Sequence, residues 1–274
     1  MRSIAMTVLA LGLVRAQGLG SLIVGIDHVP VVVSNLERAE ADFRAMGFAI
    51  KPGRSHADGI RNVHVKFTDG TEIELITAPQ AVDTLTAEYR AKLANSEGPV
   101  FFGLYAPGIP ALQAKLQASH IATERDEGLL TFPAGNPLHP IFFGGRNKSP
   151  TDKPQYFSHP NSATRFSAVW VDDSPEMRGL FRGLGISLTP ARECRLIGAS
   201  EVVTAALPEG SIHLVRPATA NVVAARVEVR SLATLESLLK KNDVAVTRDR
   251  ECDPRALWVP PSTAHGIWLE FVEK

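Results

Sequence analysis

One structural unit repeats four times along this chain of 274 residues, and the repetition constrains the fold more than any single motif. In each copy, a strand leads into an amphipathic helix and then into further strands. The third and fourth copies share the tripeptide Arg-Glu-Cys, at 192–194 and 250–252, after their helices. The pattern predicts an α+β fold of four βαβββ units, which span residues 25–77, 100–143, 165–215 and 226–272.

The sheet of a single unit keeps one face open, and a second unit can cover it, so four units predict two paired domains. Consecutive units are expected to pair, and pairing of the first unit with the fourth is the less usual alternative. The connector at 149–154 is the expected boundary, between a domain at 23–148 and a more divergent one at 155–274. Residues 83–95 indicate an extra helix outside the repeat.

A hairpin in the first unit separates apolar from polar side chains. A two-residue turn at 69–70 would mix the two kinds on both faces. A three-residue loop, with Gly70 in the left-handed conformation, instead pairs Val65 with Ile73 and His64 with Glu74. This register gathers one polar face, made of Asn62, His64, Lys66, Glu72 and Glu74.

The first strand of the same unit carries His28 on the side opposite its valines, because successive side chains of a strand alternate. If the first and last strands of the unit are neighbours, His28 joins the polar face. Imidazole nitrogens and carboxylate oxygens are ligands for divalent metal ions. The sequence therefore predicts a candidate metal site that includes His28 and Glu74.

The charge of the chain names no partner, because Lys plus Arg and Asp plus Glu both number 29. A balanced surface gives no overall attraction to nucleic acid or to an anionic membrane, and no apolar stretch is long enough to span one. We expect a small-molecule substrate, no nucleic acid and no membrane. The oligomeric state cannot be read from the sequence.

The start of the chain has features of an export signal, with Arg2 before an apolar run and small residues near position 16. Residues 1–22 are therefore a candidate signal segment, which predicts an exported or periplasmic protein; Arg15 beside the cut keeps a cytoplasmic protein as the alternative. Cys194 and Cys252 are too few for a disulfide framework. We expect buried, unreactive thiols, or a disulfide between them if the protein is exported.

The repeated unit resembles that of the vicinal oxygen chelate superfamily, and more narrowly the glyoxalase-like domain proteins. The segment 25–29, Gly-Ile-Asp-His-Val, is similar to the family's opening, and His56, Gly59 and Asn62 resemble its loop motif. His159-Pro160-Asn161 also resembles a recurrent feature of the group. The resemblance implies cup-shaped mixed sheets around a divalent metal ion that chelates two substrate oxygens, with ligands from the first and last strands of paired units.

The later units depart from this pattern. The positions expected to match His28 are Phe101, Phe166 and Ala224, none of which binds metal. Those expected to match Glu74 are Ile141 or Phe142 in the second unit, His213 in the third and Glu270 in the fourth. Pairing of the first two units alone therefore supplies His28 and Glu74. Either His64 or His56 completes the site, or pairing with the fourth unit adds Glu270.

Two functions follow from these residues. The first is a metal-dependent lyase, isomerase or dioxygenase, in which His28, Glu74 and Glu270 bind the metal ion. Glu74 and His64 would transfer protons, and the substrate would contact His56, Arg61, Asn62 and Lys66. The alternative is a metal-free protein that binds or sequesters a small molecule in the same cup.

Overall fold

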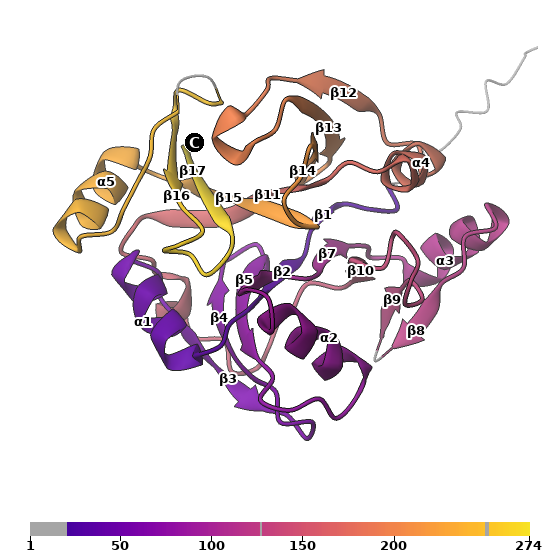
Figure 1. Ribbon diagram of the computed structural model, residues 1–274, viewed down its shortest axis with the longest axis horizontal. Coiled ribbons are helices and arrows are strands. Elements are labelled where there is room, and N and C mark those ends of the chain that lie inside the picture. Colours follow the sequence, from indigo (N-terminus) through magenta and orange to yellow (C-terminus); the bar gives the residue numbers. More distant parts are fainter. Residues whose placement is uncertain (1–20, 127, 250–251) are drawn as a thin grey trace, which may run out of the picture.

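The computed structural model describes residues 21–126, 128–249 and 252–274. Nearly all of the candidate export signal lies outside these residues, so its cleavage stays a prediction. The described part is a mixed α+β structure with five α-helices and three sheets. Figure 1 shows residues from about 160 onward, in orange and yellow, lying above the N-terminal half.

The β-α-β-β-β order predicted for the first two units is present in the structure. The first unit consists of β2 (His28–Val32), α1 (Leu36–Ala45), β3 (Lys51–Ser55), β4 (Arg61–Lys66) and β5 (Glu72–Thr77). The second consists of β7 (Phe102–Tyr105), α3 (Ile109–Ala118), β8 (Glu124–Asp126), β9 (Leu129–Thr131) and β10 (Ile141–Gly144). Two short strands precede them, β1 (Gly25–Ile26) and β6 (Gly98–Pro99).

The third unit repeats the same order, and the fourth is one strand shorter in the part that the structure describes. The third consists of β11 (Ala163–Asp172), α4 (Pro175–Gly183), β12 (Leu188–Ala191), β13 (Glu201–Leu207) and β14 (Gly210–Arg216). The fourth consists of β15 (Val222–Val229), α5 (Leu232–Lys241), β16 (Ala256–Val259) and β17 (Trp268–Glu273). In place of the missing strand, Thr247 makes an isolated bridge to Trp258.

Consecutive units contact each other through their first strands. In the C-terminal half, β11 pairs antiparallel with β15 inside one seven-stranded sheet. In the N-terminal half, β1 pairs with β7 and β2 pairs with β6, so the contact is divided between two five-stranded sheets. The domain boundaries at 148 and 155 stay a prediction, because one hydrophobic cluster contains residues from both halves, such as Phe48 and Phe271.

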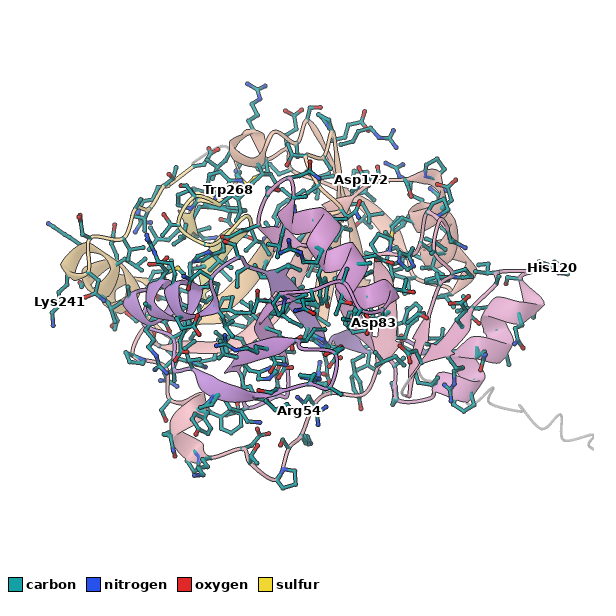
Figure 2. All side chains as sticks on the ribbon, turned by 60° about the horizontal axis from the view of Figure 1, so that its bottom comes forward. Arg54, Asp83, His120, Asp172, Lys241 and Trp268 are labelled. Carbon is teal, nitrogen blue, oxygen red and sulfur yellow. A yellow bond between two sulfur atoms is a disulfide. The ribbon has the colours of Figure 1, made fainter. Side chains whose placement is uncertain are left out.

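The extra helix is α2 (Thr84–Leu93), and Asp83 caps its first turn by accepting from the backbone N–H of Thr86. Figure 2 labels Asp83 at this helix start. The buried Tyr89 of α2 packs against Phe101, with ring centroids 6.1 Å apart. The helix therefore covers the face on which the strands of the first two units meet.

The connector between the halves is tied to the first unit. It includes a short 3-10 helix at Pro154–Phe157 and then the segment 159–161. The buried His159 bonds the backbone N–H of Ala49 and the carbonyl oxygen of Lys66. Asn161 donates to the carbonyl oxygen of Met46. The His-Pro-Asn motif thus joins the connector to the first unit.

Candidate functional site

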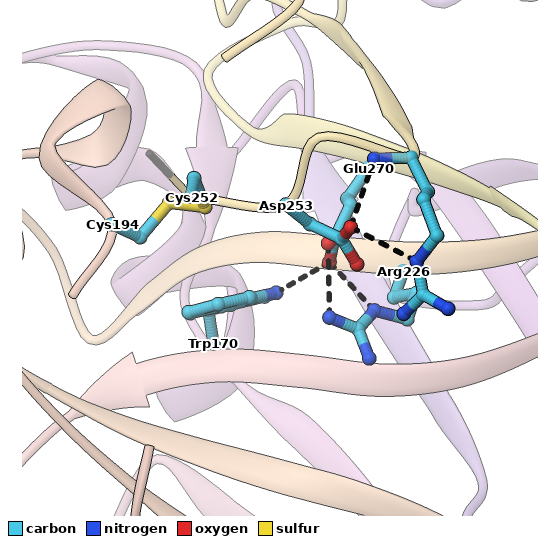
Figure 3. The surroundings of a disulfide bond; sticks show 7 residues. Trp170, Cys194, Arg226, Cys252, Asp253 and Glu270 are labelled. Carbon is cyan, nitrogen blue, oxygen red and sulfur yellow. Dashed lines mark hydrogen bonds and ion pairs between the residues drawn. A yellow bond between two sulfur atoms is a disulfide. The ribbon is translucent and has the colours of Figure 1, made fainter. Parts of the chain in front are cut away.

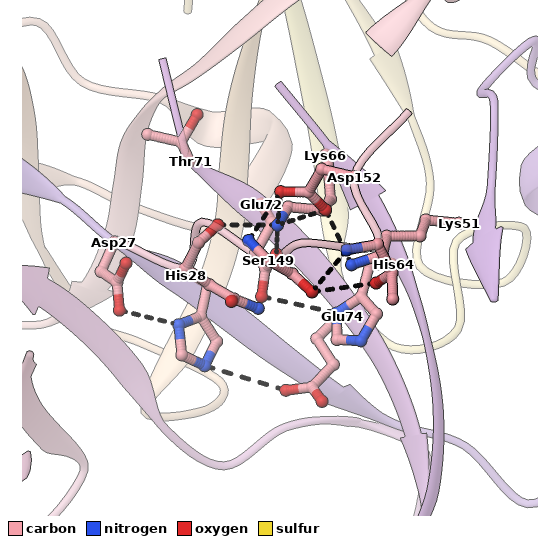
Figure 4. A network of polar contacts seen from close by, with 12 residues as sticks. Asp27, His28, Lys51, His64, Lys66, Thr71, Glu72, Glu74, Ser149 and Asp152 are labelled. Carbon is pink, nitrogen blue, oxygen red and sulfur yellow. Dashed lines mark hydrogen bonds and ion pairs between the residues drawn. The ribbon is translucent and has the colours of Figure 1, made fainter. Parts of the chain in front are cut away.

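Three neighbouring strands, β4, β5 and β2, form a polar wall in the first unit. The predicted hairpin register is confirmed, because Val65 pairs with Ile73 and His64 pairs with Glu74. The first and last strands are also neighbours, and the parallel pairing of β2 with β5 sets His28 opposite Glu72. The polar wall therefore consists of His28, Asn62, His64, Lys66, Glu72 and Glu74, as Figure 4 shows for most of them.

His28 lies between two carboxylates. Its Nδ1 is 2.9 Å from Oδ2 of Asp27, a hydrogen bond in which the ring donates to the carboxylate. Its Nε2 faces Oε2 of Glu74 at 3.8 Å, which is too long for a hydrogen bond. The ring of Phe142 packs against the imidazole, with centroids 4.8 Å apart. Asp27 thus fixes the orientation of the ring and leaves Nε2 directed at Glu74 (Figure 4).

Glu74 is held by a second partner. Nδ2 of Asn62 donates to Oε1 of Glu74 at 2.5 Å, and the backbone N–H of Arg54 donates to Oδ1 of the same asparagine. Nε2 of His56 lies 3.5 Å from Nδ2 of Asn62. The structure therefore brings His28, Glu74, Asn62 and His56 together in one chain of contacts.

A buried ion network fills the other end of the polar wall. Lys66 is fully buried, and its Nζ donates to both carboxylate oxygens of Asp152 and to the carbonyl oxygen of Asn147. Lys51 pairs with Asp152 at 2.7 Å. Glu72 lies 3.7 Å from Nζ of Lys66 and 3.4 Å from Nδ1 of His64. These partners neutralise Lys66 within the protein, and its predicted contact with a substrate stays a prediction.

The carboxylates around His28 control its protonation. Burial by itself lowers the pKa of this histidine, but Asp27, Glu72 and Glu74 outweigh burial and raise the pKa to about 9. Burial raises the pKa of Glu72, and the nearby His64, His28 and Lys66 outweigh it, so the pKa of Glu72 is lowered. The carboxylates therefore keep His28 protonated at neutral pH, and a metal ion would have to displace this proton to bind Nε2.

Several buried polar atoms near His28 make no hydrogen bond within the described part of the chain. They are Oδ1 of Asp27, Nδ1 of His64 and Oε2 of Glu72. Native proteins rarely keep such atoms without a partner, and a bound water, ion or ligand is the usual explanation. Across residues 21–126, 128–249 and 252–274, however, no group of three or more His, Cys, Asp or Glu side chains is arranged to hold a metal ion. Metal binding by His28 and Glu74, which lie 3.8 Å apart, stays a prediction.

Two residues expected at the site lie elsewhere. Arg61 points to the other side of β4, where it pairs with Glu37 of α1. Glu270 belongs to the seven-stranded sheet, where Arg226 and the indole N–H of Trp170 bind its carboxylate. The pairing of the first and fourth units, which would bring Glu270 to His28, is not what the structure has. Sequential units are neighbours instead, so the expectation of Glu270 beside His28 is wrong.

Strand registers identify the matching positions in the later units. Glu74 lies opposite Pro30, two residues after His28. By the same relation Phe142, opposite Gly103, matches Glu74, and Phe101 matches His28. In the fourth unit, Glu270 lies opposite Arg226, two residues after Ala224. This confirms that Ala224 matches His28 and that Glu270 matches Glu74. In the third unit His213 lies opposite Trp170, so the match to His28 is Ala168; the expected Phe166 is wrong by two residues and belongs to the core.

Two contributors to the site were not predicted. Asp27 precedes His28, and alternation along a strand would direct its side chain away. The structure breaks the strand at this position, since β1 ends at Ile26 and β2 begins at His28, and both side chains then meet. Asp152 was missed because it is 86 residues from Lys66 in sequence. The only signal was a lysine on an otherwise buried strand, which requires a partner.

The two cysteines, expected to be buried thiols, form a disulfide in the structure. It joins the segment before η2 (Arg195–Ile197) to the segment before β16, so the third and fourth units are linked covalently. Spacing alone did not show that the repeated folding of these units places Cys194 beside Cys252. The predicted alternative, a disulfide, is the one found.

The four repeated units and their strand pairing define a mixed α+β fold of the kind seen in solved glyoxalase and 2,3-dioxygenase structures. A model of the glyoxalase-like domain matches residues 26–177, more than half of the chain, so the protein belongs to the glyoxalase-like domain family. The resemblance noted in the sequence is thereby confirmed. No curated protein matches the sequence.

Solved structures of other proteins share the fold at low sequence identity. A hypothetical protein from Staphylococcus aureus matches with a TM-score of 0.62 and 13% identity, covering 92% of this chain and 100% of that one. The 2,3-dioxygenase LapB from Pseudomonas sp. KL28 matches with a TM-score of 0.61 and 16% identity, covering 93% and 94%. The Mn(II)-bound glyoxalase from Novosphingobium aromaticivorans matches with a TM-score of 0.57 and 12% identity, covering 92% and 83%.

In the part of the chain that the structure describes, no helix has both the length and the apolar composition needed to cross a membrane.

Proposed function

We propose that this protein is a metal-dependent enzyme of the glyoxalase-like type, in which His28 and Glu74 hold one divalent ion. The geometry of His28 carries the proposal, because Asp27 binds Nδ1 and directs Nε2 at a carboxylate that it does not hydrogen-bond. Metal-binding histidines characteristically donate their other ring N–H to a carboxylate in this way. The two protein ligands leave coordination positions for water and for adjacent oxygens of a small substrate.

A bound divalent ion would supply Lewis-acid polarisation of those oxygens. The chain's own residues would orient the Glu74 carboxylate and exclude water from one side of the site. Asn62 holds Oε1 of Glu74, which leaves Oε2 toward His28. Phe142 and Phe101 present apolar rings where other ligands would be, and with Tyr89 they keep water from that side. The same metal site would serve a lyase, an isomerase or a dioxygenase, and the chemistry of the bound substrate would decide among these reactions.

Proton transfer would fall to His64 and to Glu74, the two acid-base groups that face each other across β4 and β5. Nδ1 of His64 lies 3.4 Å from Oε1 of Glu72, and it would exchange a proton with that carboxylate or with a ligand. His56 and Asn62 would contact polar groups of the substrate. Arg61 and Lys66 have no part in this proposal, because Glu37 and Asp152 bind them.

Metal content tests the proposal directly. Purified protein is incubated with Mn²⁺, Fe²⁺, Zn²⁺ or Ni²⁺, passed over a desalting column and measured by inductively coupled plasma mass spectrometry. We expect close to one ion per chain for at least one metal, and loss of that ion in His28→Ala. His120→Ala, at an exposed histidine between α3 and β8, is the control and should retain the ion. Wild-type protein that retains no metal under any of these conditions would contradict the proposal.

A second candidate is a metal-free binding protein that uses the same cup. The observation in its favour is that Phe101 and Phe142 replace the ligands expected from the second unit. Its small-molecule ligand would stay bound in the presence of a chelator. A chelator that abolishes ligand binding would exclude this candidate, and binding unchanged by both the chelator and Glu74→Gln would favour it.

We also infer that the protein acts in an exported or periplasmic location. The disulfide between Cys194 and Cys252 supports this, because disulfides persist in oxidising compartments. Fractionation of the cells that produce the protein, with mass measurement of the N-terminus, tests it. Protein found only in the cytoplasm with reduced cysteines would overturn the inference.

A further inference from the structure

The C-terminal half contains a cavity that the proposed metal site does not use. It has a volume of about 360 Å³ and opens between the central strands of the seven-stranded sheet and the two loops joined by the disulfide. Figure 3 shows these loops beside the polar residues. The charged and aromatic residues that line it are Trp170, Arg192, His213, Arg226, Asp253 and Arg255.

The buried carboxylate beneath this cavity already has partners. Glu270 is fully buried, and Arg226 binds both of its oxygens, at 2.7 and 2.9 Å. The indole N–H of Trp170 donates to it as well. Glu270 is therefore neutralised by the protein and is not directed at a cation.

The remaining charges of the cavity are mostly positive. Arg192 and Arg255 stand at the exposed rim, whereas Arg226 lies deeper, with its side chain 23% exposed and its charge already paired with Glu270. Asp253 is the one acidic group among the lining residues, 3.5 Å from Arg255. Burial, and then Arg226, lower the pKa of His213 to about 3, so this imidazole is neutral and adds no charge. Guanidinium groups of this kind suit a carboxylate, which they can bind in two-point geometry.

The cavity also has an aromatic wall. The rings of Trp170 and His213 lie with centroids 4.3 Å apart, and Arg226 lies over the indole at 5.8 Å. Aromatic and guanidinium planes of this kind favour a flat ligand. The disulfide holds the loop of Arg192 to the loop of Asp253 and Arg255, so the rim is organised before a ligand arrives.

We propose that this cavity binds a small aromatic carboxylate, independently of the metal site in the first unit. The carboxylate would lie between the rim arginines, Arg192 and Arg255, and the ring would pack toward Trp170 and the guanidinium plane of Arg226. No bond is made or broken, so the site acts as a binding or effector site.

Intrinsic fluorescence reports on this site selectively. The chain contains three tryptophans, and all three, Trp170, Trp258 and Trp268, pack in one cluster beside the cavity. Benzoate is titrated as the probe, and benzamide serves as the neutral molecule of matching shape. We expect a saturable change with benzoate below about 10 mM and a much weaker response to benzamide.

Exposed variants test the charges without disturbing the core. Arg192→Gln and Arg255→Gln should each weaken benzoate binding about threefold, and the double variant about tenfold. Arg182→Gln, at an exposed arginine of α4, is the matched control and should bind like wild type. Equal responses to benzoate and benzamide, no saturable response, or a double variant that binds benzoate like wild type would each overturn the proposal.

The two sites can be distinguished in the same experiment. A chelator, or Glu74→Gln, should leave benzoate binding unchanged, because Glu74 and Trp170 belong to different sheets. Loss of benzoate binding on metal removal would show that the probe occupies the metal site and would overturn the proposal of a separate one.

Discussion

The polar wall of the first unit and the matching strands of the fourth unit derive from the same repeated unit, but different charged residues surround their glutamates. In the first unit, His28 is surrounded by Asp27, Glu72 and Glu74, and buried oxygens there have no hydrogen-bond donor among the described residues. In the fourth unit, a guanidinium and an indole N–H already satisfy Glu270. The glutamate at the same strand position therefore has an amide partner, Asn62, in the first unit and an arginine partner, Arg226, in the fourth.

The two units differ at two positions of their first strands, and these positions determine the partners of the glutamate. The residue two positions before the partner of the glutamate is His28 in the first unit and Ala224 in the fourth. The partner itself is Pro30 in the first and Arg226 in the fourth. A proline cannot neutralise a carboxylate, whereas an arginine can, so the residue opposite the glutamate decides whether the protein itself neutralises that carboxylate.

Removal of the Arg226 guanidinium, the charged partner of the buried Glu270, should have the largest effect on stability. Arg226→Gln leaves Glu270 buried without its charged partner, which we expect to lower the free energy of unfolding by about 3–5 kcal/mol. Chemical denaturation measures this. Arg182→Gln should change it by less than about 0.5 kcal/mol. If Arg226→Gln is as stable as wild type, the ion pair does not close this wall.

Removal of the covalent link should come next. The disulfide closes a separation of 58 residues, so the double variant Cys194→Ser/Cys252→Ser should unfold at a free energy about 2–4 kcal/mol lower. Oxidised and reduced wild-type protein provide the matched pair in denaturant. The first-unit wall lies outside this link, so its metal content should not change. A double variant of unchanged stability would show that the link does not hold the C-terminal half.

Removal of the Asp27 charge, which orients His28, should have an intermediate effect on metal affinity. Asp27→Asn keeps the shape of the side chain but removes the charge that orients Nδ1 of His28. We expect metal affinity to fall about 10- to 100-fold, measured by isothermal titration calorimetry. Asp126→Asn, on the exposed strand β8, is the control. Unchanged affinity in Asp27→Asn would mean that Asp27 does not orient a metal ligand.

The smallest effect concerns the neutral histidine of the C-terminal wall. The pKa of His213 is lowered from 6.5 to about 3, so between these values the unfolded chain binds a proton that the folded protein refuses. Stability contributed by this group is therefore present above pH 6.5 and falls as the pH drops, by up to about 2 kcal/mol at pH 5. Denaturation from pH 7 to pH 5 should show the fall in wild type and a smaller one in His213→Gln. An identical pH dependence in both would contradict it.

Local patterns were sufficient to predict the polar wall of the first unit and most of the helices and strands, although the fourth unit has one strand fewer than predicted among the described residues. Pairing of Val65 with Ile73 follows from burial alone, because the other register exposes apolar groups and buries charged ones. The polar set of the first unit follows from that register. The extra helix α2 was also predicted from its own sequence.

Side-chain contacts between segments far apart in the sequence could not be predicted from sequence patterns. Nothing local to Lys66 indicates that the connector brings Asp152 to it, and nothing local to Glu270 indicates that Arg226 binds its carboxylate. The break in the first strand at Asp27 is set by pairing with β7 on one side and β6 on the other. Such contacts depend on how strands separated in sequence pack together, and no periodicity encodes that.

The central claim is that the first-unit wall binds a divalent cation through Glu74 and His28. Calorimetric titration of wild-type protein and Glu74→Gln with Mn²⁺ tests it most directly, with Glu124→Gln on β8 as the control. The account predicts one site in wild type and in the control, and affinity at least about 100-fold weaker in Glu74→Gln. Equal binding in all three proteins, or no binding in any, would contradict it.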